Sequence, residues 1–285
     1  MKNRFFFNLI AAICLMTMTS AISLNAQDEE PDNRPIRPPF ETTNLIDNAT
    51  TVNLYKGGLN LEISHRFSEI KDIGDLFGIY GTANTRMALD YGITDRIMAG
   101  FGTTRDYKLQ DFAWKVALLT QTRSNSMPLS LSYYGNMVID ARSDDNFGPG
   151  ELYSFSNRIS YLTQVIVSHK VGPVSMQMIP SFAWFNGVAH GYNNMNMALS
   201  FGVRAQVLWS HSIILEYDQP LTQHEAMETK PNLSFGVEIG TSTHSFRVFA
   251  ANYSNIIKQY NMFYNTNDPW AGDFRFGFNI SIALR

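Results

Sequence analysis

Charged side chains recur at alternate positions of apolar stretches along this chain, and arginine is the most frequent of them. The arginine side chain presents five N–H donors in a rigid plane, which suits it to ion pairs with carboxylates and to the binding of anionic solutes. Either role requires that the charges face one another across an enclosed space. The candidates to line such a space are Arg66, Arg86, Asp90, Arg96, Lys115, Arg158, Arg204, Glu216, Glu238, Arg247 and Arg275.

The elements that must position these charges are long strands, and the clearest of them ends the chain. In residues 273–285 every even position from Phe274 to Leu284 is apolar, whereas the odd positions between Arg275 and Arg285 are small or polar. Successive side chains of a strand point to opposite faces. This segment therefore has one apolar face and one polar face.

The same alternation appears in eleven earlier segments. Most run to about nine residues or more, the length at which a tilted strand crosses a bilayer, whereas strands of soluble proteins cluster near about five or six. The count of twelve is even, as in bacterial single-chain barrels. We therefore predict an all-β fold, a transmembrane up-and-down antiparallel β-barrel of about 12 strands. The earlier segments are residues 59–67, 83–91, 96–104, 111–118, 129–137, 158–168, 174–184, 195–209, 212–217, 233–239 and 245–250.

The connections between these segments alternate in length. Outer-membrane barrels have short periplasmic turns and long outer loops, so the alternation places both chain termini in the periplasm. A soluble periplasmic sandwich gives no reason for this bias, and it would not stay with the membrane pellet after alkaline extraction. The short connections are 92–95, 122–128, 170–173, 210–211 and 240–243; the longer ones are 68–79, 105–110, 140–154, 186–194, 218–231 and 252–272.

The N-terminal region divides into two parts ahead of the barrel. Residues 1–26 read as a signal peptide, because Lys2 and Arg4 precede an apolar run and Ala26 precedes a polar, acidic stretch. The alternative is a retained helical anchor. Residues 27–52 are predicted to be a periplasmic leader whose first half is rich in proline, and residues 53–285 to be the outer-membrane β-barrel. A leader of this kind is a plain tether, folds against the periplasmic mouth or enters the lumen.

The composition excludes several classes of function. The predicted signal peptide contains the only cysteine, Cys14, so the mature chain has no disulfide and no thiolate site. It also contains two of the 22 basic residues and none of the 25 acidic ones, which leaves 20 basic residues and a net charge of −5. This balance argues against nucleic acid as a partner. No motif for a cofactor, a nucleotide or a His/Cys metal site is present.

Three stretches carry a resemblance to a known family. They are Gly58-Leu59-Asn60-Leu61-Glu62-Ile63-Ser64-His65-Arg66-Phe67, Leu89-Asp90-Tyr91-Gly92-Ile93-Thr94-Asp95-Arg96 and Asn44-Leu45-Ile46-Asp47-Asn48-Ala49. Together they resemble a Bacteroidota outer-membrane β-barrel family of unknown function, domain-of-unknown-function family 5777. The resemblance implies a location in the cell outer membrane, with contacts to lipid and to the barrel-assembly machinery, and it implies no catalytic residue. The C-terminal Leu284-Arg285 departs from the aromatic residue that usually ends an assembly signal.

The sequence favours a function other than catalysis. Twelve-stranded outer-membrane lipid hydrolases exist, and such an enzyme needs a nucleophile with a base beside it. None of the six histidines is expected to point inward in mid-strand: His65 and His169 take the outward face near strand ends, and the others fall in connections. We therefore expect the protein not to be an enzyme.

The loops offer two weaker signals. Asp140, Asp144, Asp145, Asn146 and Glu151 contain oxygen ligands that suit Ca²⁺, but their spacing differs from the EF-hand, and acidic outer loops are usually only solvated. We predict no metal there. The last loop contains the aromatic residues Tyr253, Tyr260, Phe263, Tyr264 and Trp270, which we expect to fold over the barrel mouth rather than to stack on a sugar or a partner protein.

Two interpretations of the inward charges remain open. They form a paired network that supports a narrow lumen, or they line a passage for small, anionic solutes in a porin-like protein. Passive or selective passage is the working hypothesis, and a non-conducting envelope protein that binds a partner through its loops or leader is the alternative. The leader discriminates between them, because a leader buried in the lumen makes passage unfavourable.

Overall fold

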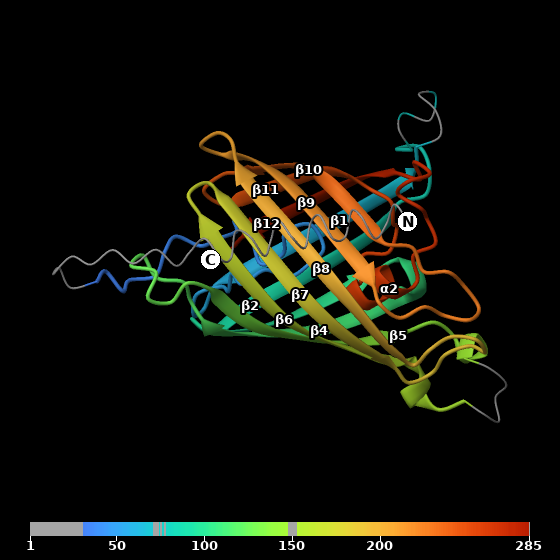
Figure 1. Ribbon diagram of the computed structural model, residues 1–285. Coiled ribbons are helices and arrows are strands. Elements are labelled where there is room, and N and C mark those ends of the chain that lie inside the picture. The colour runs from blue at the N-terminus through green and yellow to red at the C-terminus, as the bar shows by residue number, and fades with distance from the viewer. Residues whose placement is uncertain (1–30, 71–73, 75, 77, 148–152, 285) are drawn as a thin grey trace.

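Twelve strands form one closed barrel in the computed structural model, which describes residues 31–284 except residues 71–73, 75, 77 and 148–152. Each strand is antiparallel to the next in sequence, and β1 closes the ring against β12 (Figure 1). The predicted fold is confirmed. The predicted signal peptide and Cys14 lie outside the described residues. The strands are β1 (Leu59–Glu69), β2 (Asn84–Thr94), β3 (Ile97–Thr104), β4 (Leu109–Leu119), β5 (Ser130–Asp140), β6 (Ile159–Val171), β7 (Val174–Phe185), β8 (Met195–Gln206), β9 (His211–Pro220), β10 (Asn232–Gly240), β11 (His244–Ala251) and β12 (Arg275–Ala283).

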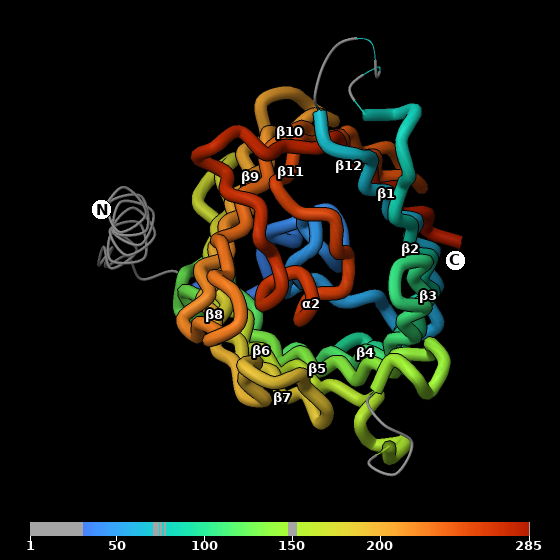
Figure 2. Tube along the Cα trace, turned by 90° about the vertical axis from the view of Figure 1, so that its right-hand side faces the viewer, coloured from blue at the N-terminus to red at the C-terminus, as the bar shows by residue number. Residues whose placement is uncertain are grey.

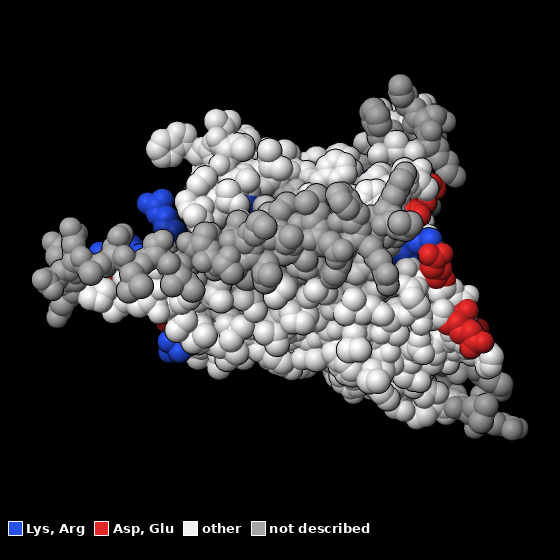
Figure 3. Space-filling view, viewed as in Figure 1, with Lys and Arg blue, Asp and Glu red and all other residues white. Residues whose placement is uncertain are grey.

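The outer face of the wall is apolar because the register brings apolar residues of neighbouring strands side by side. Leu89 of β2 pairs with Phe101 of β3, which pairs with Phe112 of β4, which in turn pairs with Met137 of β5. Leu89, Phe101 and Phe112 are all exposed. On the uncovered part of the face in Figure 3, charged residues lie at the two ends and the wall between them has none. Such a band is what a hydrocarbon layer requires.

In the described part of the chain, each helix is too short or too polar to span a bilayer.

The two ends of the barrel differ in their connections. We call the end with both described termini the turn end; it lies on the left in Figure 1 and holds residues 95–96, 120–129, 172–173, 207–210 and 241–243. The opposite end, the loop end, holds the connections 70–83, 105–108, 141–158, 186–194, 221–231 and 252–274. The predicted alternation of short and long connections holds at nine of these eleven positions.

Two connections differ from the prediction for local reasons. Residues 105–108 turn tightly through a 3-10 helix, η1 (Asp106–Lys108). Residues 120–129 are long for the turn end, and this connection binds the leader through an antiparallel bridge between Pro35 and Thr122. The amide of Ile36 donates to the carbonyl of Gln121 at 3.0 Å, and the amide of Arg123 donates to that of Arg34 at 3.0 Å.

The barrel interior contains two segments that are not part of the wall. Figure 2, seen along the barrel, shows the N-terminal segment and the helix α2 (Lys258–Phe263) inside the ring of strands. We call residues 40–52 the N-terminal plug, and residues 253–265, which include α2, the loop plug. Within the predicted leader of residues 27–52, residues 40–52 lie in the lumen, which is one of the three arrangements considered from the sequence.

Candidate functional site

The N-terminal plug is a small hairpin. An antiparallel bridge joins Asn44 to Ala49, and between them the amide of Leu45 donates to the carbonyl of Asn48 at 2.9 Å. The apolar side chains of the hairpin pack against the barrel wall: Leu45 and Ile46 are fully buried in a cluster with Ile214 of β9 and Phe249 of β11. The tip of the hairpin is therefore fixed against the wall by packing as well as by hydrogen bonds.

Glu216 of β9 holds this tip through backbone groups. Its carboxylate accepts hydrogen bonds from three successive amides, those of Ile46 at 2.9 Å, Asp47 at 3.0 Å and Asn48 at 3.1 Å. Successive amides of a turn make a concave site for an anion. Here the wall supplies the anion and the plug supplies the site, so Glu216 binds the plug instead of facing an open lumen.

Cations of the wall bind the other polar groups of the plug. The ammonium of Lys115 donates to the carbonyls of Thr43 at 3.2 Å, Thr50 at 3.0 Å and Val52 at 2.5 Å. The guanidinium of Arg247 donates to the carbonyl of Asn44 at 2.8 Å. A Lys ammonium has three donors and no acceptor. Lys115 thus uses its charge on three plug carbonyls.

Arg66 of β1 forms a buried ion pair with the plug. It bonds to the carboxylate of Asp47 at 2.5 Å, and its guanidinium lies 4.5 Å from the ring centroid of Phe249. Arg66 is fully buried, and Asp47 nearly so. A buried cation that lost its only carboxylate partner would cost several kcal/mol, so Asp47 and Arg66 depend on each other.

The remaining inward charges pair mainly within the wall. Arg86 bonds to Asp111 at 2.6 Å, and this pair lies over Gly102 of β3, where a Cβ would stand only 2.4 Å from a carboxylate oxygen. Arg204 bonds to Glu238 at 2.5 Å and lies 3.4 Å from Glu41 of the plug. The glycine-rich composition of β3 therefore makes room for an ion pair.

The structure places nine of the eleven predicted lumen-lining residues at inward positions and two elsewhere. Arg275 is inward at the outer end of β12 and only half buried. Arg96 is exposed in the turn between β2 and β3, because the β2–β3 register shifts after Gly92 and β3 begins only at Ile97. Arg158 precedes β6 at the loop end, where it bonds to the carbonyls of Asp140 and Arg142. Arg96 thus lies outside the lumen at the turn end, and Arg158 lies at the loop-end mouth of the barrel.

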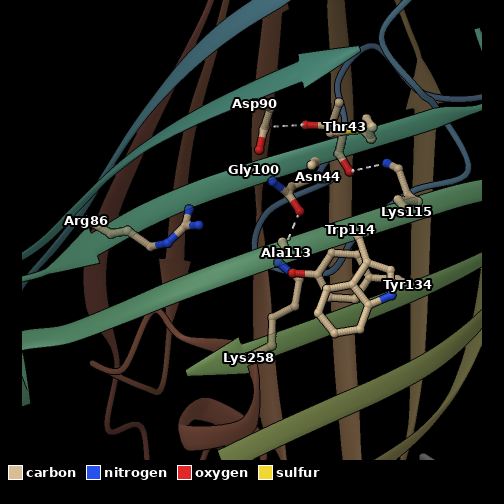
Figure 4. Close-up of a pocket in the computed structure, with 12 residues that line it drawn as sticks. Thr43, Asn44, Arg86, Asp90, Gly100, Ala113, Trp114, Lys115, Tyr134 and Lys258 are labelled. Atoms are coloured by element: carbon tan, nitrogen blue, oxygen red, sulfur yellow. Dashed lines mark hydrogen bonds between the residues drawn. The ribbon is translucent and has the colours of Figure 1, made fainter. Parts of the chain in front are cut away.

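A small cavity remains between the plug and the wall of β2 to β5. Figure 4 shows Asp90, Arg86 and Lys115 around it, with Asp90 accepting a hydrogen bond from the hydroxyl of Thr43 at 3.4 Å. Its volume is about 20 Å³, which is room for about one water molecule. This cavity is too small for a solute.

The loop plug completes the filling from the other end. Lys258 of α2 donates to the side-chain carbonyl of Asn44 at 3.1 Å, so the two plugs touch. Met262 and Phe263 of α2 belong to one buried cluster with Ala49 of the N-terminal plug and with wall residues of β5 to β8. The helix is short, and it is these contacts that hold it in place.

Burial of the inward side chains shows how completely the lumen is filled. Each of the twelve strands has at least one inward residue from which water is almost fully excluded. A lumen as wide as a water molecule along its length would leave these side chains exposed. They are Glu62, Asp90, Met98, Asp111, Asn136, Gln164, Gln177, Ser200, Glu216, Ser234, Arg247 and Asn279, in strand order.

A larger cavity of about 660 Å³ opens at the loop end, above the loop plug. One part of its lining is aromatic, from Tyr107, Phe185, Tyr192, Tyr260 and Tyr264. The rest comes from the β5–β6 connection with the adjoining strand ends, from residues 187–189 and from Asn255, and more than half of these residues are polar. Its volume lies within the range of small-molecule sites, about 300–1,000 Å³. We call it the outer cavity.

His224 fixes the floor of the outer cavity. Its Nδ1 accepts from the amide of Asn193 at 3.1 Å, so Nε2 carries the proton and donates to the carbonyl of Phe263, 3.0 Å away. Its ring stacks on Tyr264 with centroids 5.3 Å apart. Burial lowers the pKa of His224. The neutral imidazole thus joins two outer loops to the end of α2.

Two of the loop residues considered as Ca²⁺ ligands, Asp140 and Asp144, are paired with arginines. Arg142 binds both carboxylate oxygens of Asp140, and these hydrogen bonds raise the pKa of Arg142. Asp144 is paired with Arg158. Glu151 lies outside the described residues, and in the remainder of the chain no group of three acidic or histidine side chains is arranged to hold a metal ion.

The histidines lie away from the lumen. His65 stacks on Phe67 at the outward face of β1, and Nδ1 of His169 lies 2.7 Å from the carbonyl of Pro128. His211 and His244 are the first residues of β9 and β11 at the turn end, where they contact the hydroxyls of Ser210 at 3.0 Å and Thr243 at 2.8 Å.

The plug contacts were missed by sequence reasoning. Their residues were visible, because Asn44 to Ala49 is one of the three stretches that carry the family resemblance and Glu216, Lys115 and Arg247 were among the inward charges. What binds them together is mainly backbone hydrogen bonding. Backbone N–H and C=O groups are present at nearly every residue, so the sequence does not indicate which of them the wall will bind.

Comparisons with known proteins agree with this architecture. The NanC porin shares 6% identity over 80% of this chain and 99% of its own, with a TM-score of 0.51. The COG4313 outer-membrane channel from Pseudomonas putida F1 shares 10% identity over 82% of this chain and 98% of its own, with a TM-score of 0.49. At 6% identity the likeness to the NanC porin concerns the fold alone. No curated protein matches the chain in sequence.

The family model described as "Membrane bound beta barrel domain (DUF5777)" matches residues 40–284, so it includes both the N-terminal plug and the wall. The outward apolar face accordingly contacts outer-membrane lipid. This match shows that the chain belongs to the DUF5777 family of membrane-bound β-barrel domains, and the protein is an outer-membrane β-barrel.

Proposed function

We propose that the protein is an outer-membrane barrel closed by its own plugs, which acts through what it binds at its loop end and not through open passage of solutes. The observation that carries this proposal is the position of residues 40–52 inside the lumen, where Glu216, Lys115, Arg66 and Arg247 bind them. Of the inward cations that would attract an anionic solute, Arg66, Arg86, Lys115, Arg204 and Arg247 are already engaged with the plug or with carboxylates of the wall.

The proposal reverses the order of the two hypotheses drawn from the sequence. A plug buried in the lumen was the condition under which passage becomes unfavourable, and burial of the inward side chains on every strand supports the non-conducting alternative. The fold similarity to the NanC porin does not oppose this, because a barrel of one architecture can be open or plugged. Small-solute passage through this chain would require at least the N-terminal plug to leave the lumen.

The proposal also gives the barrel an orientation and a route of assembly. Short turns lie in the periplasm in outer-membrane barrels, so the turn end and the leader face the periplasm and the outer cavity faces the cell exterior. The barrel-assembly machinery would insert the chain in this orientation. We assign no catalytic activity, since the contacts between hydroxyl groups and histidines at Ser210 and Thr243 lie on the periplasmic side, away from the cavity.

The experiment is a conductance measurement in a planar lipid bilayer. The purified full-length protein, shown to be folded by its heat-dependent mobility on a gel, is expected to produce no stable current steps. Stable steps from the folded full-length protein would refute the proposal.

Two variants show whether the N-terminal plug is the cause of the expected absence of current. Deletion of residues 40–52 is expected to produce current, reduced by the loop plug that stays in place. If the deleted chain does not fold, the double substitution Lys115→Ala and Glu216→Ala removes the main polar contacts of the wall with the plug while keeping the chain intact. Asp111→Asn is the control, because Asp111 pairs with Arg86 of the wall.

A further inference from the structure

The lining of the outer cavity combines two kinds of side chain. The rings of Tyr107, Tyr260, Tyr264 and Tyr192 form a continuous stacked series, which we call the aromatic wall, with successive centroids 6.0, 5.8 and 5.7 Å apart. Residues of the β5–β6 connection add amide groups and the guanidinium of Arg142 to the lining. The cavity thus brings aromatic rings and hydrogen-bonding groups together.

The aromatic wall is rigid before anything binds. Phe185, which is buried at the end of β7, meets Tyr260 and Tyr264 edge-on with centroids 5.5 and 5.2 Å apart. Tyr192 and Tyr264 both lie against the ring of His224. Four separate segments of the chain therefore fix the rings. Rings held in place lose little conformational freedom on binding.

The cations of this cavity are already neutralised. Arg142 is bound by both carboxylate oxygens of Asp140 and stacks on Tyr107 at 4.5 Å. Arg158 donates to the Tyr153 hydroxyl and pairs with Asp144. A site for an anion needs uncompensated positive charge, and this cavity has none among its described residues. The occupant that suits it is uncharged.

We propose that the outer cavity binds a neutral saccharide. The C–H faces of a sugar ring are apolar and pack on aromatic rings, while its hydroxyl groups both donate and accept hydrogen bonds. The tyrosine hydroxyls of this lining, the amides of Asn146 and Asn157 and the paired Asp140 and Arg142 are groups that can share hydrogen bonds with such hydroxyls. A purely apolar ligand would separate these polar groups from water without offering hydrogen bonds in exchange.

This inference deepens the proposed function, since it names the class of ligand at the loop end, but its test does not depend on closure of the lumen. The saccharide is either a free oligosaccharide or the head of a glycolipid in the outer leaflet, and the experiment separates these two sources. A conducting protein that binds sugars would refute only the proposed closure.

Binding is measured by isothermal titration calorimetry on the full-length protein in a detergent without a sugar head. The probes are tetrasaccharides of α-1,4-glucose, β-1,4-glucose, α-1,6-mannose and β-1,4-xylose, together with sulfated forms of each. Vesicles that contain digalactosyl diacylglycerol test the glycolipid source. We expect binding of at least one neutral tetrasaccharide or of the neutral glycolipid, and weaker binding of every sulfated form.

Variants tie the binding to this cavity. Tyr192→Ala removes one end of the aromatic wall and is expected to weaken binding about tenfold, the factor that corresponds to ~1.4 kcal/mol. Tyr107→Asn removes the other end and tolerates the left-handed backbone of that residue, whose φ is 56°. Tyr80→Ala, which changes a tyrosine that is 77% exposed at the loop end and does not line the cavity, is the control with unchanged affinity.

Three results would overturn the inference. They are no heat of binding with any neutral probe, tighter binding of the sulfated forms, and equal affinity in Tyr192→Ala, Tyr107→Asn and the unaltered protein.

Discussion

Glu216→Gln is the substitution that tests most directly how the plug is held. One carboxylate oxygen accepts from the amides of Ile46 and Asn48, and the other accepts from Asp47 at 3.0 Å and from Asn48 at 3.3 Å. Glutamine keeps the first oxygen but places an NH₂ group where the second one was. Two donors then face each other at Asp47, and the bonds that remain are no longer charge-assisted.

The size of the effect follows from these contacts. Hydrogen bonds to a charged partner contribute about 1.5–3 kcal/mol each. Losing one such bond and weakening two others predicts a loss of ~2–4 kcal/mol in the docking free energy of the plug. The lower end is favoured, because the substitution also relieves repulsion between Glu216 and the nearby carboxylates of Asp47 and Asp218. A loss of ~2 kcal/mol raises the undocked population about 30-fold.

Hydrogen–deuterium exchange with mass spectrometry measures this population. Amides of residues 45–50 are expected to exchange about 30-fold faster or more in Glu216→Gln than in the unaltered protein. Asp111→Asn is the matched control, since it also replaces one buried inward carboxylate, but one that bonds to Arg86. Equal exchange in Glu216→Gln and the unaltered protein, or an equal increase in Asp111→Asn, would show that Glu216 does not hold the plug.

Two further predictions test the loop plug and the membrane face. Burial keeps the pKa of His224 below its ordinary value of 6.5, so the contribution of His224 to anchoring α2 is complete above pH 6.5 and is lost as the pH falls below that value. Hydrogen exchange at residues 259–264, corrected for the intrinsic rate, should therefore be faster at pH 5. His224→Gln should remove this pH dependence, and its persistence in the variant would mean that another group titrates. Leu89→Arg places a charge in the exposed apolar band and is expected to lower the free energy of unfolding by about 2–4 kcal/mol, as measured by urea titration in lipid vesicles. Leu208→Arg, in a turn-end connection, should leave it nearly unchanged. Equal losses in the two variants would mean that Leu89 does not face hydrocarbon.

The barrel wall was predictable because apolar and polar residues alternate along each strand with a period of two. In β12 the apolar residues from Phe276 to Ile282 and the intervening small or polar residues define both faces, and the register of β1 against β12 then follows from matching like faces. The errors fall where the pattern runs past the end of a strand. Arg96 continues the alternation of β3, and residues 207–209 that of β8, yet these residues lie in turns.

The filled lumen was not predictable from the same pattern. Residues 40–52 have no periodicity, and inward arginines and carboxylates are equally consistent with pairing across an open lumen. What decides between the two is geometry: Lys115 reaches three carbonyls that come together only when the hairpin is folded inside the wall. The aromatic residues of the last loop were expected to fold over the mouth. Tyr253 and Phe263 are buried and α2 enters the barrel, which is deeper than that expectation.

The hydrogen bonds between the wall and the N-terminal plug constrain the order in which the parts of the barrel can fold. The hairpin is made first, but Glu216, Arg247 and Asn279, which hold its backbone, belong to β9, β11 and β12, the last part of the chain to be made. Contacts between such distant parts of a sequence form late in folding. The hairpin precedes β1 in the chain, and β1 pairs with β12 to close the barrel. Closure of the barrel therefore brings the hairpin next to its last partners. A truncated chain would leave the plug undocked, so the docked hairpin marks a finished barrel.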